Sequence, residues 1–488
     1  MLKQADILTK LQPHQQKALE RALKNNLILA HSTGSGKTLT SIAIADKLGV
    51  PATVLTPAPL VENFKKELLK HKKGGPKVDV RSLPTAISRG YNIPEGNTLI
   101  VDEAHSLRNA GTQRQKYIQD QARRASRILL LTGTPAYNNL TDWAPLVNIA
   151  AGEDVVPATP SAFEEKYVQE HKVHPGFIAR LKGVKAGVVK KLKNTADLKK
   201  RLSKYVDVFD ADVEKPKRVD ETIKVDLSPE QQKMYAAVSG KVPYSLIYKM
   251  HNNLPPSKSE AAQLNAFLTG VRQISNSMAD YDTTLSEEDL ERTSPKLRKA
   301  VEYLASQYKK DKDFRGFVYS NYLKSGVEPV ATMLKRRGIP YNVFTGAIGH
   351  KDRKRIVEEY NSGKTPIIIG SGSASEGLDL KGTSVIQLLE PHFNQARLDQ
   401  VIGRGIRYKS HEHLPPLKRK VLVQKYLATL PDDRGFIAKL LGEKRRTGVD
   451  EYLEGLSTQK QGLIDETKAL FRPIGQAPIS EFSASSLQ

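Results

Sequence analysis

The sequence of 488 residues contains no cysteine and no long apolar segment. The absence of cysteine excludes disulfides, thiolate zinc sites and cysteine nucleophiles, and it fits a reducing compartment. No apolar run approaches the roughly 18 residues that span a bilayer, and the opening stretch MLKQADILTKLQPHQQ lacks the apolar core of a signal peptide. We therefore expect an intracellular, cytoplasmic protein.

Acidic residues are few relative to basic ones. The chain has 76 Lys and Arg against 53 Asp and Glu, which gives a formal net charge of +23. A globular chain this basic favours a polyanionic partner, and nucleic acid is the first candidate. An anionic membrane is the rival. The sequence shows no basic amphipathic helix with an aromatic-rich apolar face, so we predict no membrane contact.

Short apolar runs alternate with helical patterns from residue 26 to about 150, and the alternation returns from about 315 to 430. Strands that alternate with helices predict a parallel sheet with helices on both faces. The runs interpreted as strands are NLILA, ATVLTP, TLIVDEA, RILLLTGTP, GFVYSN, YNVFTG, PIIIGSG, SVIQLLE and KVLVQKYL. We therefore predict the α/β class, with two parallel-sheet lobes.

The predicted domains are lobe 1 (1–150), a mainly helical basic insertion with a linker (151–300), lobe 2 (301–430) and a C-terminal helical extension with a flexible tail (431–488). The insertion contains KAGVVKKLKNTADLKKRLSK, from residue 185 to 204. Two interpretations of this run stay open: a solvated helical face, or a protrusion that faces phosphates.

A glycine-rich turn joins a predicted strand to a predicted helix in ILAHSTGSGKTLT, residues 28–40. This arrangement wraps backbone N–H groups around a phosphate at a helix N-terminus. Gly34 and Gly36 allow close approach of the backbone, Lys37 would neutralise the β- and γ-phosphates, and the Thr38 hydroxyl would hold Mg²⁺. The strict pattern has glycine where this chain has His31.

Two adjacent carboxylates, Asp102 and Glu103, end the apolar strand of TLIVDEAH. The carboxyl edge of a parallel sheet is where such sheets bind ligands. Carboxylates that follow buried residues are costly unless a cation or hydrogen bonds hold them. Beside a phosphate loop, we expect Asp102 to bind Mg²⁺ and Glu103 to orient and deprotonate the attacking water.

Four motifs in one order, GSGKT, DEAH, TGTP and QVIGRGIR, resemble those of superfamily-two helicases of the DEAH type. The resemblance implies two RecA-like lobes that bind ATP and Mg²⁺ in the cleft between them. It also implies that Arg404 and Arg407, with Gln400 one turn earlier, stabilise the charge of the phosphoryl transition state. Arg404 and Arg407 are three apart on a predicted helix, so we expect them on one face.

The resemblance narrows to the Swi/Snf-type translocases through LQPHQQKAL, TPAPLVENFKKEL, DEAHSLRN and VRQISNSM. Within that family, GRGIRYKSHEHLPPLKRKV and VDEYL are most similar to compact viral and phage members, including poxviral nucleoside triphosphate phosphohydrolases. For a viral or phage protein, the cytoplasm would be that of the host.

The resemblance also implies further site residues. Those for ATP are Gln15, Gly34, Ser35, Gly36, Lys37, Thr38, Gly377 and Asp379, and those that couple the sites are His105, Thr132, Gly133 and Thr134. The nucleic-acid contacts implied are Thr56, Pro57, Thr345, Gly346, Ser371, Gly372 and Ser373. The last group lies at predicted strand ends, where small residues or a helix N-terminus accept a phosphate.

The function implied is an ATP-dependent motor on double-stranded DNA that acts as a monomer in viral or phage replication, recombination or transcription. A polymerase, or another replication or recombination protein, is a candidate further partner. Two alternatives stay open. One is an RNA or single-strand helicase, and the other is a non-hydrolysing accessory subunit, which the presence of the lysine, the acidic pair and both arginines disfavours.

Overall fold

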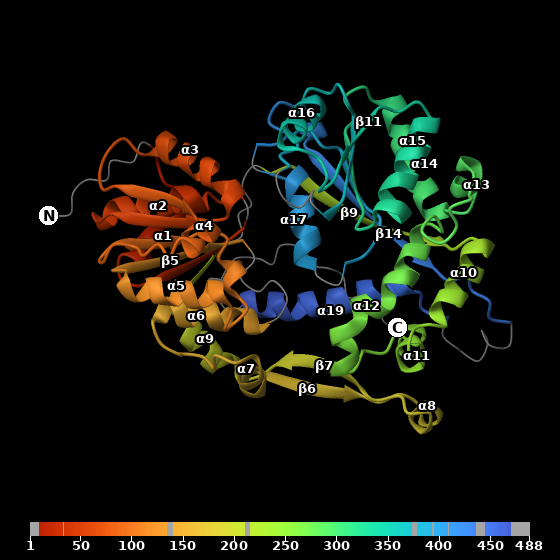
Figure 1. Ribbon diagram of the computed structural model, residues 1–488, viewed down its shortest axis with the longest axis horizontal. Coiled ribbons are helices and arrows are strands. Elements are labelled where there is room, and N and C mark those ends of the chain that lie inside the picture. The colour runs from red at the N-terminus through yellow and green to blue at the C-terminus, as the bar shows by residue number, and fades with distance from the viewer. Residues whose placement is uncertain are drawn as a thin grey trace. The chain divides into compact units, whose positions relative to one another are not determined.

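The structure is a computed structural model, and it describes residues 9–32, 34–133, 140–209, 215–372, 378–392, 395–407, 409–435 and 445–469. These residues form two compact units (Figure 1). Unit 1 comprises the described parts of Met1–Gln169, Leu192–Ala211 and Gly462–Gln488, and unit 2 comprises those of Glu170–Lys191 and Asp212–Gln461.

Unit 1 is built on a six-stranded sheet in the order β3-β2-β4-β5-β1-β8, and every neighbouring pair of strands is parallel. The strands are β1 Leu27–His31, β2 Ala52–Thr56, β3 Val78–Ser82, β4 Thr98–Val101, β5 Arg127–Thr132 and β8 Val206–Phe209. Alternate residues of a strand point to opposite faces. In β1, Ile28 and Ala30 join one core cluster and Leu27 and Leu29 another, so apolar side chains cover both faces of the sheet.

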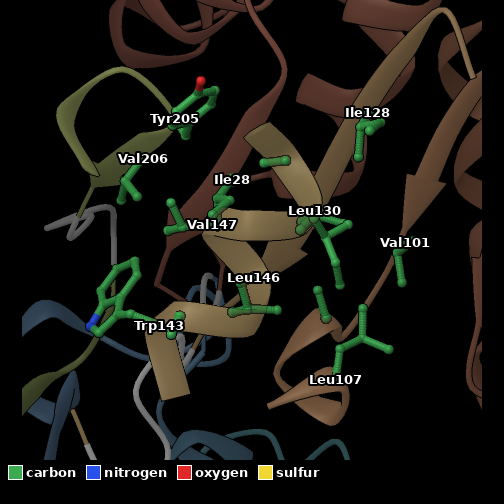
Figure 2. Close-up of a cluster of buried hydrophobic side chains, with 14 of the residues drawn as sticks. Ile28, Val101, Leu107, Ile128, Leu130, Trp143, Leu146, Val147, Tyr205 and Val206 are labelled. Carbon is green, nitrogen blue, oxygen red and sulfur yellow. The ribbon is translucent and has the colours of Figure 1, made fainter. Parts of the chain in front are cut away.

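The helices of unit 1 lie on the two faces of this sheet. They are α1 Pro13–Ala22, α2 Lys37–Leu48, α3 Val61–His71, α4 Leu83–Ser88, α5 Gln113–Arg124, α6 Trp143–Ala151, α7 Pro160–Tyr167 and α9 Thr195–Ser203, with the 3-10 turns η1 Ala58–Leu60, η2 Ala104–Leu107 and η3 Leu140–Asp142. Figure 2 shows Leu146 and Val147 of α6 beside Ile28 and Leu130 of the sheet. Trp143 of α6 is fully buried in the same cluster.

Unit 2 contains a second six-stranded parallel sheet, in the order β11-β12-β10-β13-β14-β9. Its strands are β9 Lys217–Asp226, β10 Gly316–Tyr319, β11 Tyr341–Phe344, β12 Ile367–Gly370, β13 Val385–Leu388 and β14 Lys420–Thr429. Phe317 and Ile386 face a cluster with α17 (Gln395–Gly405), whereas Val318 and Val385 face a cluster with α14 (Pro295–Lys310) and α15 (Glu328–Arg336). The predicted α/β class with two parallel-sheet lobes is therefore confirmed.

Most remaining elements of unit 2 are helices (Figure 1). They are α8 Phe177–Leu181, α10 Pro229–Ser239, α11 Tyr244–His251, α12 Lys258–Asn276, α13 Glu287–Arg292, α14 Pro295–Lys310, the π-helical turn η4 Leu323–Val327, α15 Glu328–Arg336, α16 His350–Asn361, α17 Gln395–Gly405, the 3-10 turn η6 Pro416–Lys418 and the first part of α19 Val449–Ala469. A separate two-stranded sheet pairs β6 Val168–Val173 with β7 Gly187–Leu192. None of the helices in the described ranges is long and apolar enough to cross a membrane.

The stretch 151–300, predicted as an insertion, contributes one edge strand to each large sheet. β8 pairs with β1 in unit 1, and β9 pairs with β14 over ten residues in unit 2. The basic run from 185 to 204 forms β7 and α9 rather than one continuous helix. The boundaries at 150, 300 and 430 stay predictions.

A buried ion pair ties α19 to α14 in unit 2. The Lys296 ammonium lies 2.7 Å from an Asp450 carboxylate oxygen, and the two side chains are 1% and 0% exposed. The same oxygen accepts a hydrogen bond from the backbone N–H of Ala428 at 2.8 Å. Removal of one member of such a pair leaves an uncompensated buried charge.

We therefore expect Lys296→Met to lower the free energy of unfolding of unit 2 by about 3–5 kcal/mol. Urea denaturation followed by circular dichroism measures this change. The control is Lys418→Met, which breaks a half-exposed pair with Asp311 and should change stability far less, because solvent screens such a pair. Equal effects of the two substitutions would contradict a stabilising role for the buried Lys296–Asp450 pair.

Candidate functional site

The glycine-rich turn of unit 1 has the conformation that a phosphate loop needs. Gly34 and Gly36 have φ angles of 82° and 79°, in the left-handed region that glycine adopts without strain. Gly36 precedes the first residue of α2, and a Cβ at this position would lie 2.4 Å from Nε2 of Gln15. The N-terminus of α2 therefore carries its N–H groups and its positive dipole end at the loop.

Lys37 and Ser35 have polar groups that a phosphate would satisfy. Lys37 Nζ donates to the backbone oxygens of His31 at 2.7 Å and Ser32 at 3.2 Å, so the side chain folds back over the loop. The Ser35 hydroxyl is buried, and no hydrogen-bond partner for it exists among the described residues. Since a buried hydroxyl without a partner is unfavourable, this atom fits a site completed by an anion.

Two side chains of α1 contact backbone oxygens of the loop. Gln15 is 3% exposed, and its Nε2 lies 3.3 Å from the backbone oxygen of Ser35 and 3.4 Å from that of Gly36. His14 Nε2 lies 3.0 Å from the same Ser35 oxygen. The sequence predicts that Gln15 contacts adenine. In this structure its side-chain amide donates hydrogen bonds to backbone oxygens of the glycine-rich loop.

His31, which stands where the strict motif has glycine, is fully buried and points toward the edge strand β8. Its Nε2 lies 2.7 Å from one Asp207 oxygen, and Arg21 donates to the other at 2.6 Å. Burial raises the pKa of Asp207. The hydrogen bond from His31 and the charges of His31 and Arg21 together lower this pKa by more than burial raises it, so it lies below its usual value. The departure from the motif thus connects β1 to β8.

Sequence reasoning missed Asp207. Asp207 and His31 are 176 positions apart, and the short strand that carries Asp207 follows the basic run of the insertion. Phe209 of the same strand stacks on the His14 ring, with centroids 3.7 Å apart and an interplanar angle of 5°. No motif in the sequence marks this strand, although an aspartate between two valines is compatible with an edge position.

The acidic pair lies at the carboxyl end of β4. Thr56 donates its hydroxyl to Asp102 Oδ2 at 3.1 Å, and the backbone N–H of Glu103 donates to Oδ1 at 3.0 Å. Burial and the charge of Glu103 raise the pKa of Asp102 to about 6, against the opposing effects of the Thr56 hydrogen bond and the Lys37 charge. Asp102 is therefore a carboxylate whose ionised form a nearby cation would stabilise.

Glu103 has a backbone conformation that is rare for a residue with a side chain. Its φ of 50° and ψ of 47° are left-handed, which costs about 1 kcal/mol or more. It precedes η2, and its carboxylate lies 3.2 Å from His105 Nδ1. The strained turn follows the end of β4, and the Glu103 side chain there contacts His105, one of the predicted coupling residues.

Thr38 and Asp102 are chemically suited to Mg²⁺. This ion is commonly bound by one or two carboxylates with substrate phosphates and water rather than by a cage of protein ligands. Within the described ranges no group of three or more His, Asp or Glu side chains could hold a metal. A single buried carboxylate with a raised pKa beside a phosphate loop matches a Mg²⁺ site in which the protein and the substrate phosphates each supply ligands.

The other predicted residues of unit 1 lie at ends of strands next to this site. Thr132 is fully buried at the end of β5, between β4 and β1, and Gly133 follows it. Thr134 lies outside the described residues. The Thr56 side chain, for which the sequence predicts a nucleic-acid contact, is fully buried and is engaged by Asp102, whereas Pro57 is partly exposed and precedes η1.

In unit 2 the two predicted catalytic arginines do not share a helical face as expected. α17 ends at Gly405, so Gln400 and Arg404 lie on the helix but Arg407 lies two residues beyond its end. Arg407 Nε donates to the Gly403 backbone oxygen at 3.1 Å, and Nη1 lies 3.2 Å from Asp379. The prediction of one face is wrong because the chain leaves the helix after a glycine.

The Asp379 side chain, for which the sequence predicts an ATP contact, is 60% exposed and lies 3.2 Å from Arg407 Nη1. The asparagine amide of Asn361 donates to the Asp379 backbone oxygen at 2.9 Å. Gly377, predicted beside it, lies outside the described residues.

Four predicted nucleic-acid residues converge at the carboxyl ends of β11 and β12, which are neighbours in the sheet. Thr345 and Gly346 follow β11, Ser371 and Gly372 follow β12, and the Ser371 N–H donates to the Phe344 backbone oxygen at 3.1 Å. A Cβ on Gly372 would lie 2.8 Å from the Arg397 guanidinium. Ser373 lies outside the described residues.

Three family models match the sequence. They are the SNF2-related domain over residues 82–279, the helicase conserved C-terminal domain over 295–409, and the type III restriction enzyme, res subunit, over 8–55. The first two contain the acidic pair and both arginines, and the third contains the phosphate loop.

Viral proteins are among the similar sequences. A protein of Acanthamoeba polyphaga mimivirus named "Putative ATP-dependent RNA helicase" is 31% identical over 470 residues, which cover 93% of this chain and 94% of the relative. A protein of African swine fever virus named "Termination factor NPH-I homolog" is 25% identical over 545 residues, which cover 91% of this chain and 75% of the relative.

Two solved structures also resemble the chain. The SWI2/SNF2 ATPase core of Sulfolobus solfataricus in complex with dsDNA has a TM-score of 0.37 and 17% identity, and the match covers 97% of this chain and 98% of that one. The Hef helicase domain of Pyrococcus furiosus has a TM-score of 0.49 and 15% identity, with 89% and 98% covered.

Thr56→Val tests the environment of Asp102. The Thr56 hydrogen bond lowers the pKa of Asp102, so its loss should raise that pKa above about 6. A carboxyl group is ionised only above its pKa. We therefore expect binding of Mg²⁺ with ATP to weaken on acidification at a higher pH in the variant, with little change at pH values well above the raised pKa.

The measurement is the Kd for Mg²⁺ with ATP as a function of pH. Thr53→Val is the control, since Thr53 is buried on the same strand but accepts a hydrogen bond from Asn97, which does not ionise. If both variants show the same pH dependence as the unmodified chain, Thr56 does not set the pKa of Asp102.

Proposed function

The chain belongs to the Snf2-type helicases of superfamily two, beside viral members, and from this premise we propose that it is an ATP-driven translocase on double-stranded DNA. Its activity class is nucleic-acid-stimulated hydrolysis of ATP. The proposal consists of the preference for duplex DNA, the biological process in which the protein acts and the roles of individual residues.

One observation supports hydrolysis above all others. The acidic pair after β4 and the phosphate loop after β1 flank the end of β5 at one edge of the sheet of unit 1. The charge of Lys37 acts on Asp102 there. A chain that only bound nucleic acid would gain nothing from a desolvated carboxylate next to a phosphate loop, because burial of that charge is unfavourable.

In the proposed mechanism Lys37 and the N–H groups at the start of α2 bind the β- and γ-phosphates. Thr38 and Asp102 hold Mg²⁺, which when bound supplies positive charge to the phosphate oxygens. Glu103 orients the attacking water and accepts its proton, and His105, in contact with Glu103, links this event to the neighbouring strand ends.

Arg404 and Arg407 complete the proposed chemistry. A cation at the transferred phosphoryl group stabilises the negative charge that spreads over its equatorial oxygens. Asp379 and the Gly403 backbone oxygen hold Arg407 in one orientation, so less side-chain freedom is lost when it engages phosphate.

We propose that the strand ends after β11 and β12 grip the phosphate backbone of the nucleic acid. Gly346, exposed just after β11, offers a backbone N–H group, and such contacts position a protein without reading sequence. The formal charge of +23 supports a partner of many phosphates. For 6 to 10 phosphate contacts, the slope of log K against log salt should be roughly −5 to −9.

The names of the viral relatives support different nucleic acids and processes. The African swine fever virus relative is named a termination factor, which favours transcription among replication, recombination and transcription. The mimivirus relative is named an RNA helicase, which keeps RNA as the second candidate substrate. The resemblance to Swi/Snf-type translocases, with which the match to the SNF2-related domain over 82–279 agrees, implies duplex DNA.

The deciding experiment is steady-state ATP hydrolysis without nucleic acid and with single-stranded DNA, double-stranded DNA or RNA, at one fixed salt concentration. Strong stimulation by duplex DNA supports the proposal. Stimulation by RNA or single-stranded DNA alone would instead favour an RNA or single-strand helicase. The absence of hydrolysis under every condition would contradict the proposal.

Lys37→Ala and Glu103→Gln should each abolish turnover while leaving DNA affinity within a few fold. Lys37 acts on the phosphates and Glu103 on the water, so neither is needed for the strand ends of unit 2 to hold nucleic acid. Turnover and DNA binding are measured on the same preparations. Parallel loss of both activities would indicate misfolding or a wrong assignment.

Arg407→Ala should lower kcat on the order of 10³-fold, by the precedent of cations that stabilise the phosphoryl transition state. The control is Arg419→Ala, because Arg419 likewise donates two hydrogen bonds in unit 2, here to backbone oxygens, but is exposed and has no proposed role. Near-normal turnover of the Arg407 variant would exclude its catalytic role.

A further inference from the structure

The β6–β7 hairpin of unit 2 carries a short helix at its end that the proposed function does not use (Figure 1). The hairpin is firmly seated on the loop between α11 and α12. Val188 N–H donates to the Pro256 oxygen at 3.1 Å, and Lys258 lies 2.8 Å from Glu170. At Gly187 a Cβ would lie 2.0 Å from the Pro255 oxygen, so only glycine permits this approach.

Helix α8 at the hairpin end turns its large apolar side chains outward. Phe177, Ile178 and Leu181 are 67%, 71% and 73% exposed, whereas the small Ala179 is 3% exposed and Val184, just after the helix, is also buried. The helix therefore packs through its small residue and presents its three large ones to solvent. A soluble surface rarely gathers such side chains unless they meet a partner.

The surroundings of this helix are basic and aromatic. Residues 177–193 contain six Lys and Arg and no Asp or Glu. The Arg180 guanidinium lies 5.9 Å from the Phe177 ring centroid, and Lys182 Nζ lies 5.9 Å from that of Tyr244, which is 53% exposed on α11. Tyr248 lies beside Tyr244, with ring centroids 6.3 Å apart.

We propose that this surface, formed by Phe177, Ile178, Leu181 and Tyr244 and called here the tip patch, binds unpaired bases of a nucleic acid. The proposal rests on the proposed function, which brings nucleic acid to the protein. Bases stack on exposed aromatic rings, and cations between the rings hold the phosphates that link the bases. The tip patch would engage a single-stranded tail or a frayed duplex end, whereas the strand ends after β11 and β12 follow the backbone.

Charge and ring content favour this ligand over others. An acidic peptide or an anionic lipid surface would also meet cations and apolar side chains. Neither needs the alternation of rings with cations that places Arg180 beside Phe177 and Lys182 beside Tyr244. The repeating base and phosphate of a single strand match that alternation.

The test replaces the apolar part of the tip patch with Phe177→Ser, Ile178→Ser and Leu181→Ser together. All three side chains are exposed, so the fold should tolerate the change. The matched control is Leu417→Ser, since Leu417 is 91% exposed elsewhere in unit 2. Fluorescence anisotropy gives the Kd for a blunt duplex and for the same duplex with a single-stranded tail, at one salt concentration.

We expect the triple variant to bind the tailed duplex about tenfold or more weakly, given the loss of at least one stacked base. Its affinity for the blunt duplex and its basal hydrolysis of ATP should stay within about twofold of the unmodified chain, and Leu417→Ser should change neither. Equal loss on both duplexes, or no loss on the tailed one, would overturn the tip patch alone. Failure of the unmodified chain to bind any nucleic acid would overturn the proposed function as well.

A direct readout comes from Phe177→Trp. The chain has a single tryptophan, Trp143, which is fully buried, so the introduced indole is the solvent-accessible one. Stacking with a base should quench its emission on addition of single-stranded DNA or RNA, and the unmodified chain gives the background. Quenching by a peptide rich in Asp and Leu or by anionic vesicles, but by no nucleic acid, would overturn the proposal in favour of those ligands.

Discussion

Parallel pairing of the strands is the constraint on which the arrangement of both units depends. Parallel strands with crossover connections place all carboxyl ends at one edge of a sheet, and the helix that follows each strand begins at the same edge. In unit 1 this brings the phosphate loop after β1, the acidic pair after β4 and Thr132 of β5 to one edge. In unit 2 it gathers the ends of β11 and β12. Residues far apart in the chain become neighbours through topology alone.

At the proposed nucleotide site, burial of the acidic pair favours a bound cation. Asp102 is held by Thr56 and by a backbone N–H, yet burial and Glu103 still keep its pKa near 6. A carboxylate in this condition has more to gain from a cation than an exposed one has. The buried Ser35 hydroxyl, which has no hydrogen-bond partner among the described residues, follows the same logic, since it is unfavourable in the free protein and fits a bound phosphate. The backbone strain at Glu103 is also unfavourable, and it accompanies the contact of the Glu103 carboxylate with His105.

The apolar runs of the sequence predict nine strands of the two large sheets. Eight of them are central parallel strands, which are buried on both faces and therefore rich in apolar residues, and the ninth is the edge strand β11. The three strands that the runs do not reveal, β3, β8 and β9, are edge strands. β9 reads KRVDETIKVD and is mostly exposed, so its charges resemble those of a loop. Of the site, the loop and the acidic pair are local motifs. The partner of His31 and the end of α17 depend on tertiary contacts that a motif does not contain.

The position of Trp143 has a spectroscopic consequence. It is the single tryptophan of the chain, and it lies in the core of unit 1 against the sheet that carries the nucleotide site (Figure 2). Intrinsic indole emission therefore reports on one unit alone, while circular dichroism reports on both. If the two signals change at different denaturant concentrations, the units unfold as separate cooperative blocks, and the stability of each can be measured without separating them.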